Sequence, residues 1–265
     1  MLNFAKRIAL EAGDIVKKYY YSDHLVIENK SEKDLVTEAD KACEKFLVEA
    51  INKEFMGHGI LGEEGFSNDN TKDYTWIIDP IDGTSNFAHR LPIFAISIGL
   101  ENKNKEIILG IVYNPISGEF FSAEKGKGAY LEIIGANGIN MEPKKLQVSK
   151  ETKLSKSLLA TGFHPAFPKM MKRNFKYFEE LQMASHTIRR LGAASIDLAY
   201  TAAGYFEGYW ELKLKPWDMA AGVLLVTEAG GKVSTLDNSD FSIYDPEILA
   251  TNGLIHEEIL TYFKQ

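Results

Sequence analysis

One short acidic segment carries residue types that metal-dependent chemistry needs. Residues 79–84 read Asp-Pro-Ile-Asp-Gly-Thr and follow an apolar run. Pro80 removes a backbone donor and stiffens the bend, so Asp79 and Asp82 lie around one tight turn. Carboxylates are ligands for hard cations such as Mg²⁺, and free amides at a helix opened by Gly83 suit a phosphate. An ordinary Asp-Pro turn followed by a capping aspartate explains the same residues.

Other acidic residues also lie where apolar strands end or helices begin. Glu63 and Glu64 form a pair between two glycines, where like charges repel unless they share a cation or are well solvated. Asp218 opens an apolar helix, and Asp40 lies three residues after Thr37. Each has a simpler interpretation: a solvated loop for the pair, a favourable helix dipole for Asp218, and a capping box for Asp40.

Taken together with Glu211, these acids indicate a polynuclear metal cage for phosphoryl chemistry. No Cys or His pair has the spacing of a zinc site. No Gly-x-x-x-x-Gly-Lys-[Ser/Thr] loop is present, which argues against a P-loop nucleotidase. The six histidines are scattered and are interpreted as structural.

The composition is that of a globular protein. Hydrophobic residues make up 45% of the 265 residues and charged residues 25%. The formal net charge of −7 argues against a dedicated binder of nucleic acid polymers. The single cysteine, Cys43, fits a reducing compartment. No uncharged apolar run approaches the ~18 residues that span a bilayer. We therefore expect a cytoplasmic protein with no membrane partner.

Hydrophobic periodicity predicts the elements that position the acids. Helices are expected over 2–20 and from about residue 37, followed by hairpin strands over 75–79, 94–100, 107–113 and 119–123. Beyond residue 158 we expect strands at 158–161, 186–190, 205–211, 232–235 and 248–251, alternating with helices at 168–184, 193–203, 217–229 and 255–264. This order favours a layered α+β or α/β architecture. A composition shift near 146–157 divides the compact unit into residues 1–150, with most metal ligands, and 151–265, which complete the site.

Three motifs resemble the signatures of the inositol monophosphatase family. They are Glu63-Glu64, residues 79–84, and Trp-Asp-Met-Ala-Ala at 217–221, in the family's order and approximate spacing. This family belongs to the lithium-sensitive, Mg²⁺-dependent phosphatases, which include fructose-1,6-bisphosphatases and 3′-phosphoadenosine phosphatases. The resemblance covers nearly the whole chain. It implies an α+β fold, layered as an α/β/α/β/α sandwich, together with lithium sensitivity and a homodimer.

The resemblance also implies two or three Mg²⁺ ions. Glu63, Asp79 and the Ile81 carbonyl would hold the first ion. Asp79, Asp82 and Asp218 would hold the second. A third, weaker ion would lie near Glu63.

The resemblance further assigns catalytic and substrate-binding roles. Thr84, hydrogen-bonded to Asp40, would orient the attacking water, so Asp40, Glu63 and Thr84 form the expected catalytic set. The amides of Gly83 and Thr84 would hold the phosphate. The expected substrate-binding residues are Asp82, Gly83, Thr84, Gly192, Ala193, Ala194, Glu211 and Asp218.

One departure from the family pattern affects selectivity. The family usually has a hydroxyl residue after Gly192, whereas this chain has Ala193. The change removes one contact to a substrate hydroxyl and puts strict myo-inositol selectivity in question. Arg189 and Arg190 precede this segment and are either readers of a second phosphate or surface residues of a strand.

The leading hypothesis is a Mg²⁺-dependent phosphomonoesterase that hydrolyses inositol monophosphate, a small phosphorylated metabolite. The alternative within the superfamily is a phosphatase for fructose 1,6-bisphosphate, 3′-phosphoadenosine 5′-phosphate or NADP. The alternative from another class is a non-catalytic regulator or assembly partner.

Overall fold

The structure is a computed structural model that describes residues 1–31, 34–68, 72–135, 142–164 and 167–264. The helices within these ranges are α1 (Leu2–Tyr20), α2 (Glu38–Glu54), α3 (Thr84–Ala88), α4 (Pro168–Ala184), α5 (Ala194–Ala202), α6 (Pro216–Glu228) and α7 (His256–Phe263), with a 3₁₀ turn at Leu154–Lys156. None of them has the length and apolar character needed to cross a lipid bilayer.

The described strands form two sheets and a small ribbon. The large sheet contains, in spatial order, β3 (Gly59–Gly62), β4 (Tyr74–Asp82), β5 (Ala95–Asn102), β6 (Ile107–Tyr113), β7 (Glu119–Glu124), β8 (Gly128–Ile133) and β9 (Lys144–Lys145). The small sheet contains β11 (Thr187–Arg189), β10 (Leu158–Thr161), β12 (Gly208–Leu212), β14 (Glu247–Thr251) and β13 (Lys232–Ser234). The ribbon pairs β1 (Ile27–Ser31) with β2 (Asp34–Thr37).

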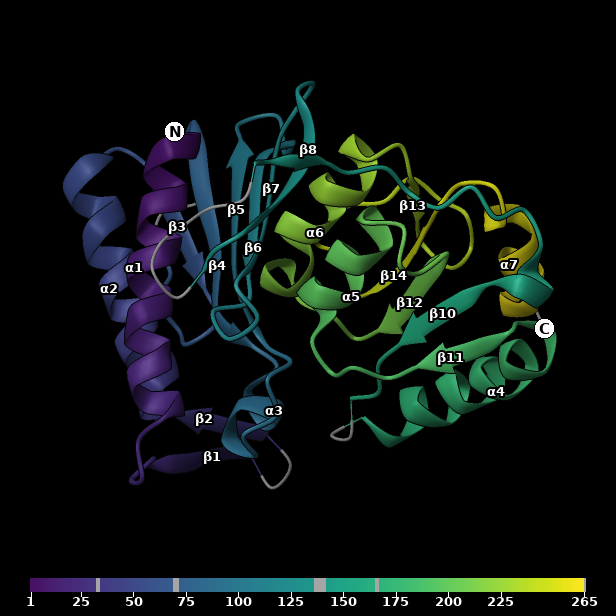
Figure 1. Cartoon of the computed structure of the whole chain (residues 1–265), viewed down its shortest axis with the longest axis horizontal. Coiled ribbons are helices and arrows are strands. Elements are labelled where there is room, and N and C mark those ends of the chain that lie inside the picture. The colour runs from purple at the N-terminus through teal and green to yellow at the C-terminus, as the bar shows by residue number, and fades with distance from the viewer. Residues whose placement is uncertain (32–33, 69–71, 136–141, 165–166, 265) are drawn as a thin grey trace.

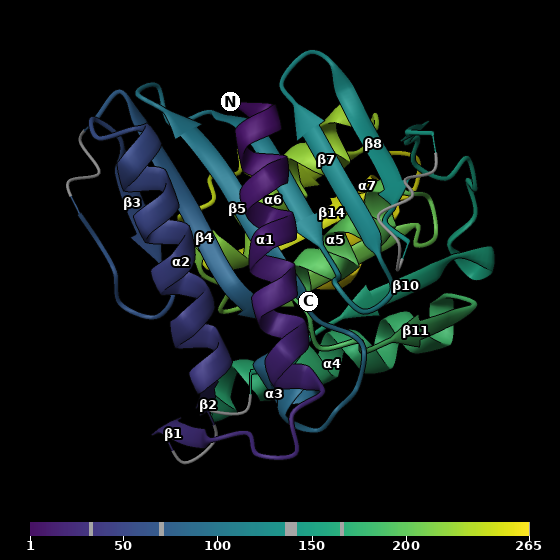
Figure 2. The same cartoon turned by 60° about the vertical axis from the view of Figure 1, so that its left-hand side comes forward.

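The elements stack as five layers, helices alternating with sheets (Figure 1). The helices α1 and α2 cover the outer face of the large sheet (Figure 2), while α5 and α6 lie between the two sheets. The helices α4 and α7 cover the far face of the small sheet. The structure confirms the predicted α+β layered sandwich. The division of the chain at residue 150 stays a prediction.

Strand direction differs between the two sheets. From β4 to β9 all neighbours are antiparallel, as the hairpin pattern predicts, but β3 runs parallel to β4. In the small sheet, β10 lies parallel to both β11 and β12, and β14 runs antiparallel to β12 and β13. Strand β4 of the large sheet contacts α6, and strand β12 of the small sheet contacts α5.

Small residues bring α6 close to the large sheet. A Cβ added at Gly99 on β5 would lie 2.7 Å from the Cβ of Ala220, and one added at Gly110 on β6 would lie 2.7 Å from the Ala221 carbonyl oxygen. Since no larger residue fits at either position, the N-terminal half of α6 lies directly against the large sheet. The first turn of this helix carries Asp218.

Most predicted elements lie within one or two residues of their observed bounds, and β4 and β12 are exceptions. The prediction ends the first of these strands at residue 79, whereas β4 continues to Asp82. The prediction begins the second at residue 205, whereas β12 begins at Gly208. The amides of Tyr205 and Phe206 donate hydrogen bonds to the Tyr200 carbonyl of α5, so these two residues belong to the turn that ends α5 and not to the strand. Strands β2, β3, β8 and β9 were not predicted.

Candidate metal centre

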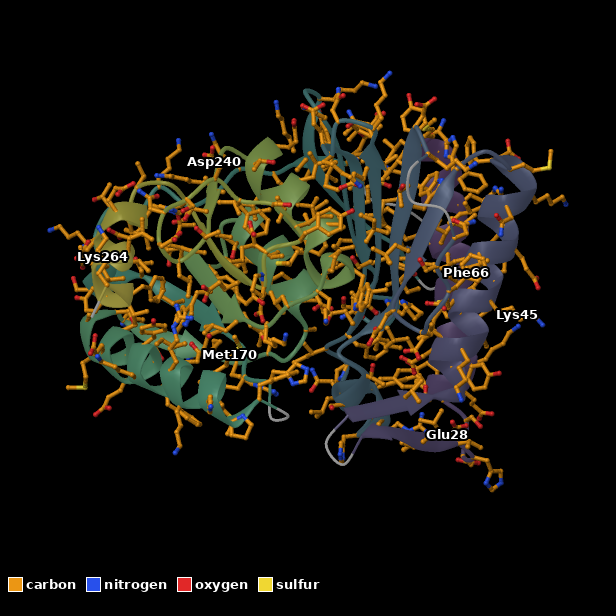
Figure 3. The ribbon with its side chains drawn as sticks, turned by 180° about the vertical axis from the view of Figure 1, so that it is seen from behind. Glu28, Lys45, Phe66, Met170, Asp240 and Lys264 are labelled. Carbon is orange, nitrogen blue, oxygen red and sulfur yellow. The ribbon has the colours of Figure 1, made fainter. Side chains whose placement is uncertain are left out.

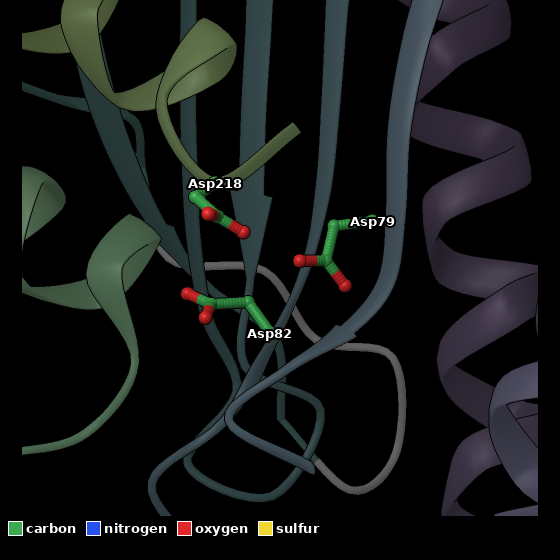
Figure 4. Close-up of side chains that lie close together, drawn as sticks. All are labelled: Asp79, Asp82 and Asp218. Atoms are coloured by element: carbon green, nitrogen blue, oxygen red, sulfur yellow. The ribbon is translucent and has the colours of Figure 1, made fainter. Parts of the chain in front are cut away.

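Three aspartates meet where β4 ends and α6 begins (Figure 4). Asp79 and Asp82 come from β4, and Asp218 comes from the first turn of α6. One carboxylate oxygen from each aspartate lies within 4.8 Å of the other two. Among the described residues, this is the only group of three or more potential metal-ligating side chains that lie this close together. Asp79 and Asp82 are buried and Asp218 is half-buried.

A bulge in β4 aims the first two aspartates. Asp79 pairs with Ser97 and Asp82 with Ala95, so three steps along β4 match two steps along β5. The extra residue breaks the strict alternation of a strand, in which residues three apart would face opposite sides of the sheet. The Asp-Pro-Ile-Asp segment thus brings both carboxylates to one place.

Protein donors fix the orientation of these carboxylates. The Ile81 amide donates to Oδ1 of Asp79 at 3.0 Å, and the Lys215 amide donates to Oδ2 of Asp218 at 2.7 Å. Both donors lie within three residues of their acceptor, so the local turn sets each orientation. The helix-start interpretation of Asp218 therefore holds alongside its place in the cluster.

The third aspartate is held from another part of the chain. Oδ2 of Asp82 accepts hydrogen bonds from both the amide and the hydroxyl of Ser195, each at 2.6 Å. Ser195 lies in the first turn of α5 and is fully buried. Sequence reasoning did not identify Ser195.

Crowding and burial disfavour the charged forms of these acids. Burial raises the pKa of Asp79 well above its usual range, and the charges of Glu63, Asp82 and Asp218 raise it further. Burial likewise raises the pKa of Asp218, followed by the charges of Asp82 and Glu63. Burial also raises the pKa of Asp82. A self-repelling set of oxygen donors of this kind fits a hard divalent cation such as Mg²⁺.

The turn after β3 separates the two neighbouring glutamates. Glu63 lines the same pocket as Asp82 and Asp218, whereas Glu64 lines a second pocket beside α2. Glu44 of α2 accepts hydrogen bonds from the amides of Glu64 at 2.8 Å and Phe66 at 3.2 Å. Figure 3 shows Phe66 on the outer side of this turn, next to α2. Glu44, which sequence reasoning missed, therefore holds the turn that presents Glu63.

Asp40 has two sets of partners. Its Oδ2 accepts the Thr37 amide at 2.8 Å, which completes the capping box of α2, and its Oδ1 accepts the Thr84 hydroxyl at 3.2 Å. The same hydroxyl lies 3.0 Å from the Ile81 carbonyl oxygen. Burial raises the pKa of Asp40 to about 7, although the Thr37 donors oppose the shift. The cap and the contact with Thr84 therefore coexist.

A pocket of about 370 Å³ opens between the two sheets beside the aspartates. From the predicted sets it is lined by Glu63, Asp82, Gly83, Thr84, Gly192, Ala194, Glu211 and Asp218. Ala193 is buried, and its methyl group packs against Gly83. Asn86 holds this wall in place by donating to the carbonyl of Leu191 at 2.8 Å.

Glu211 lines another part of the same pocket. Tyr209 donates its hydroxyl to Oε2 of Glu211 at 2.7 Å. Burial raises the pKa of Glu211 to about 7, opposed by the Tyr209 hydrogen bond. A Cβ added at Gly162 would lie 1.9 Å from the same oxygen, so only glycine leaves room for this carboxylate.

The two arginines before Gly192 have different surroundings. Arg189 donates to Thr187 and to the Ile188 carbonyl, along its own strand. Arg190 lines the pocket, and one of its guanidinium nitrogens lies 2.8 Å from where a Cβ of Gly192 would be. Arg190 is therefore the arginine that faces the pocket.

Comparisons with known proteins agree with this geometry. A family model described as "Inositol monophosphatase family" matches residues 1–265. The chain is 40% identical to an inositol-1-monophosphatase of Caulobacter vibrioides, over 97% of this chain and 94% of the relative. It is also 40% identical to "Nus factor SuhB" of Pseudomonas aeruginosa, over 98% and 94%. The structure of "extragenic suppressor protein suhB" from Bartonella henselae matches with a TM-score of 0.89, at 34% identity over 99% of this chain and 98% of the other.

Proposed function

The chain belongs to the inositol monophosphatase family, and from this premise we propose that it is a Mg²⁺-dependent phosphomonoesterase that hydrolyses inositol monophosphate. The observation that carries the proposal is the convergence of Asp79, Asp82 and Asp218 beside a pocket that Glu63, Asp82 and Asp218 line. Clustered carboxylates beside a pocket are the donors that phosphoryl-transfer sites use to hold divalent ions.

Five residues would hold the ions, two or three in number. They are Glu63, Asp79, Asp82 and Asp218 through their carboxylates and Ile81 through its carbonyl. When bound, Mg²⁺ would supply Lewis-acid chemistry, lowering the pKa of a water and offsetting the charge of the phosphate and of the leaving oxygen.

Thr84 and Asp40 would orient the attacking water. The Thr84 hydroxyl is too weak an acid to act as a base at neutral pH, so its contribution is geometric. It lies 3.0 Å from the Ile81 carbonyl oxygen and 3.2 Å from Oδ1 of Asp40. With the carbonyl engaged by an ion, Oδ1 of Asp40 would accept the hydroxyl proton in a hydrogen bond. The hydroxyl oxygen then accepts a hydrogen bond from the water, which fixes where the water lies.

The two pocket walls would hold the ester. The amides of Gly83 and Thr84 would bind phosphate oxygens, and Gly83 has a positive φ of 93° that favours glycine. The wall at Gly192 and Ala194 and the carboxylate of Glu211 would contact hydroxyl groups of the alcohol portion. The hydrogen bond from the Tyr209 hydroxyl would fix the orientation of the Glu211 carboxylate.

The proposal is tested by phosphate release from inositol 1-phosphate with millimolar Mg²⁺ and in Mg²⁺-free buffer. We expect turnover with Mg²⁺ and none without it. Asp218→Asn serves as the negative control, because it removes the charge of one proposed ligand and keeps its shape. Turnover that is indifferent to Mg²⁺ would contradict the proposal.

A second candidate substrate class is supported by the charge of the pocket. Arg190, Lys213 and Lys215 all line it. Three cations at one mouth suit an ester whose alcohol portion bears another anionic group, such as fructose 1,6-bisphosphate, 3′-phosphoadenosine 5′-phosphate or NADP. A comparison of kcat/KM across these esters and inositol 1-phosphate decides between the two classes.

A non-catalytic role is the remaining alternative, since several relatives carry the name "Nus factor SuhB". The retained carboxylates argue for catalysis, and negligible turnover across the ester panel would favour the regulatory role. Family membership further supports lithium inhibition, a homodimer and a cytoplasmic location. Lithium titration, sedimentation and cell fractionation test these three properties.

A further inference from the structure

A buried serine connects the metal cluster to the substrate wall. The Ser195 side chain is fully buried, and its hydroxyl has a carboxylate of the cluster as its partner. Together with its own amide it places two donors on a single oxygen of Asp82, each at 2.6 Å. Two donors on one oxygen restrict rotation of the carboxylate, to which the neighbouring Ala194 amide also donates.

The three aspartates differ in how their orientation is set. Asp79 and Asp218 are each held by an amide two or three residues away, within their own turns. Asp82 is held by a residue 113 positions away in the chain. Its orientation therefore depends on how the start of α5 packs against the end of β4.

Building on the proposed function, we propose that Ser195 is a positioning residue for the cation. Its hydroxyl and amide hold Oδ2 of Asp82 and thereby fix the orientation of this carboxylate within the cluster. Because Ser195 directly follows the wall segment that ends at Ala194, the same contact ties the metal ligand to that wall. Partners of metal-ligating carboxylates typically change metal affinity by about 10–100-fold when removed.

The test compares Ser195→Ala with the wild type and with Ser157→Ala. Ser157 is equally buried, and its hydroxyl donates to the Lys153 carbonyl far from the cluster, so the control removes a matched hydroxyl. Mg²⁺ affinity is measured by calorimetry and as the half-saturating Mg²⁺ concentration for phosphate release. The melting temperature of each Mg²⁺-free protein is measured alongside.

We expect Ser195→Ala to bind Mg²⁺ about tenfold more weakly, with kcat at saturating Mg²⁺ close to that of the wild type. Ser157→Ala should leave Mg²⁺ affinity unchanged. A Ser195→Ala protein with a lower melting temperature but unaltered Mg²⁺ affinity would overturn the inference and leave Ser195 a purely structural residue.

A second variant covers the case in which Ser195→Ala does not fold. Ser195→Cys keeps the branching of the side chain but replaces the oxygen by a larger sulfur and a strong donor by a weak one, so weaker Mg²⁺ binding is again expected. Unchanged binding would overturn the inference. If the wild type itself neither binds Mg²⁺ nor releases phosphate, the proposed function fails; if it does both and the Ser195 variants match it, only the positioning role fails.

Discussion

The Thr84 hydroxyl lies 3.2 Å from Oδ1 of Asp40, a residue 44 positions earlier in the chain. The other oxygen of that carboxylate caps α2 through Thr37. One buried aspartate therefore joins the start of a helix to the bulged end of β4. Because its two oxygens have separate partners, the capping role and the proposed catalytic role can be separated by mutation.

We predict that Asp40→Asn and Thr84→Ala each lower kcat, by about a hundredfold, with smaller effects on Mg²⁺ and substrate binding. The two losses should be non-additive, because residues that act as a unit share one loss. A double-mutant cycle in kcat measures this directly.

Thr37→Ala is the control for the cap in this cycle. It removes the capping hydroxyl and should cost about 1 kcal/mol of stability, with kcat retained. Fully additive losses in the Asp40 and Thr84 cycle would mean that Asp40 is only a helix cap.

We next predict that Asp82→Asn abolishes turnover while the fold stays intact. The introduced amide keeps an oxygen that can accept the two hydrogen bonds from Ser195, but the negative charge toward the cation is lost. The Mg²⁺-free melting temperature should stay the same or rise, since repulsion among the carboxylates is relieved. Retention of more than about a tenth of kcat, a loss of only ~1.4 kcal/mol, would contradict the ligand assignment.

We predict that the effect of Mg²⁺ on thermal stability depends on pH. Burial raises the pKa of Asp40 from 3.8 and of Glu211 from 4.5 to about 7, and it raises the pKa of Asp79, Asp82 and Asp218 as well. The folded chain therefore holds protons that the unfolded chain has released. The contribution of these groups to stability is complete below their ordinary pKa values and is lost as pH rises through the folded ones.

Because Mg²⁺ competes with these protons, the rise in melting temperature that it produces should grow between about pH 5 and about pH 8. Thermal melts in Mg²⁺-free buffer and with millimolar Mg²⁺, across this range, provide the measurement. A melting temperature that ignores Mg²⁺ at every pH would count against a shared metal site.

Sequence reasoning located the parts of the site that local chemistry sets. The capping box at Thr37 and Asp40 marks the start of α2, and the Asp-Pro-Ile-Asp segment brings both aspartates together, although as a bulge in β4 and not as the predicted turn after residue 79. Each of these motifs spans only a few residues, so it can be recognised in the sequence without knowledge of the tertiary structure. The same holds for most helix bounds, which follow from an apolar spacing of three and four residues.

The partners that orient the site could not be read in this way. Ser195 bonds to Asp82 across 113 positions, and Glu44 bonds to the Glu64 amide across 20. A glutamate on the apolar face of α2 is only weak sequence evidence for a functional role, because the sequence does not show which residue it contacts. Strand β3, four residues that include two glycines, is fixed mainly by its pairing with β4. Such contacts depend on tertiary packing rather than on local pattern.

The last prediction separates the substrate wall from the metal cluster. Gly162→Ala should displace the Glu211 carboxylate, because the added Cβ would lie 1.9 Å from Oε2, the oxygen that accepts the Tyr209 hydroxyl. The side chain can swing away, so the fold should survive, but the carboxylate no longer faces the hydroxyl groups of the alcohol. We expect KM for inositol 1-phosphate to rise about tenfold, or ~1.4 kcal/mol.

Inhibition by inorganic phosphate and the half-saturating Mg²⁺ concentration should stay unchanged in Gly162→Ala, because Glu211 is not among the proposed phosphate or metal contacts. Gly57→Ala is the matched control, since a Cβ at Gly57 meets no atom within 4 Å. Steady-state kinetics of the wild type, Gly162→Ala and Gly57→Ala measure KM, phosphate inhibition and the Mg²⁺ dependence separately. An unaltered KM in a folded Gly162→Ala protein would remove Glu211 from the substrate wall, and a parallel loss of Mg²⁺ affinity would show that wall and cluster respond as one unit.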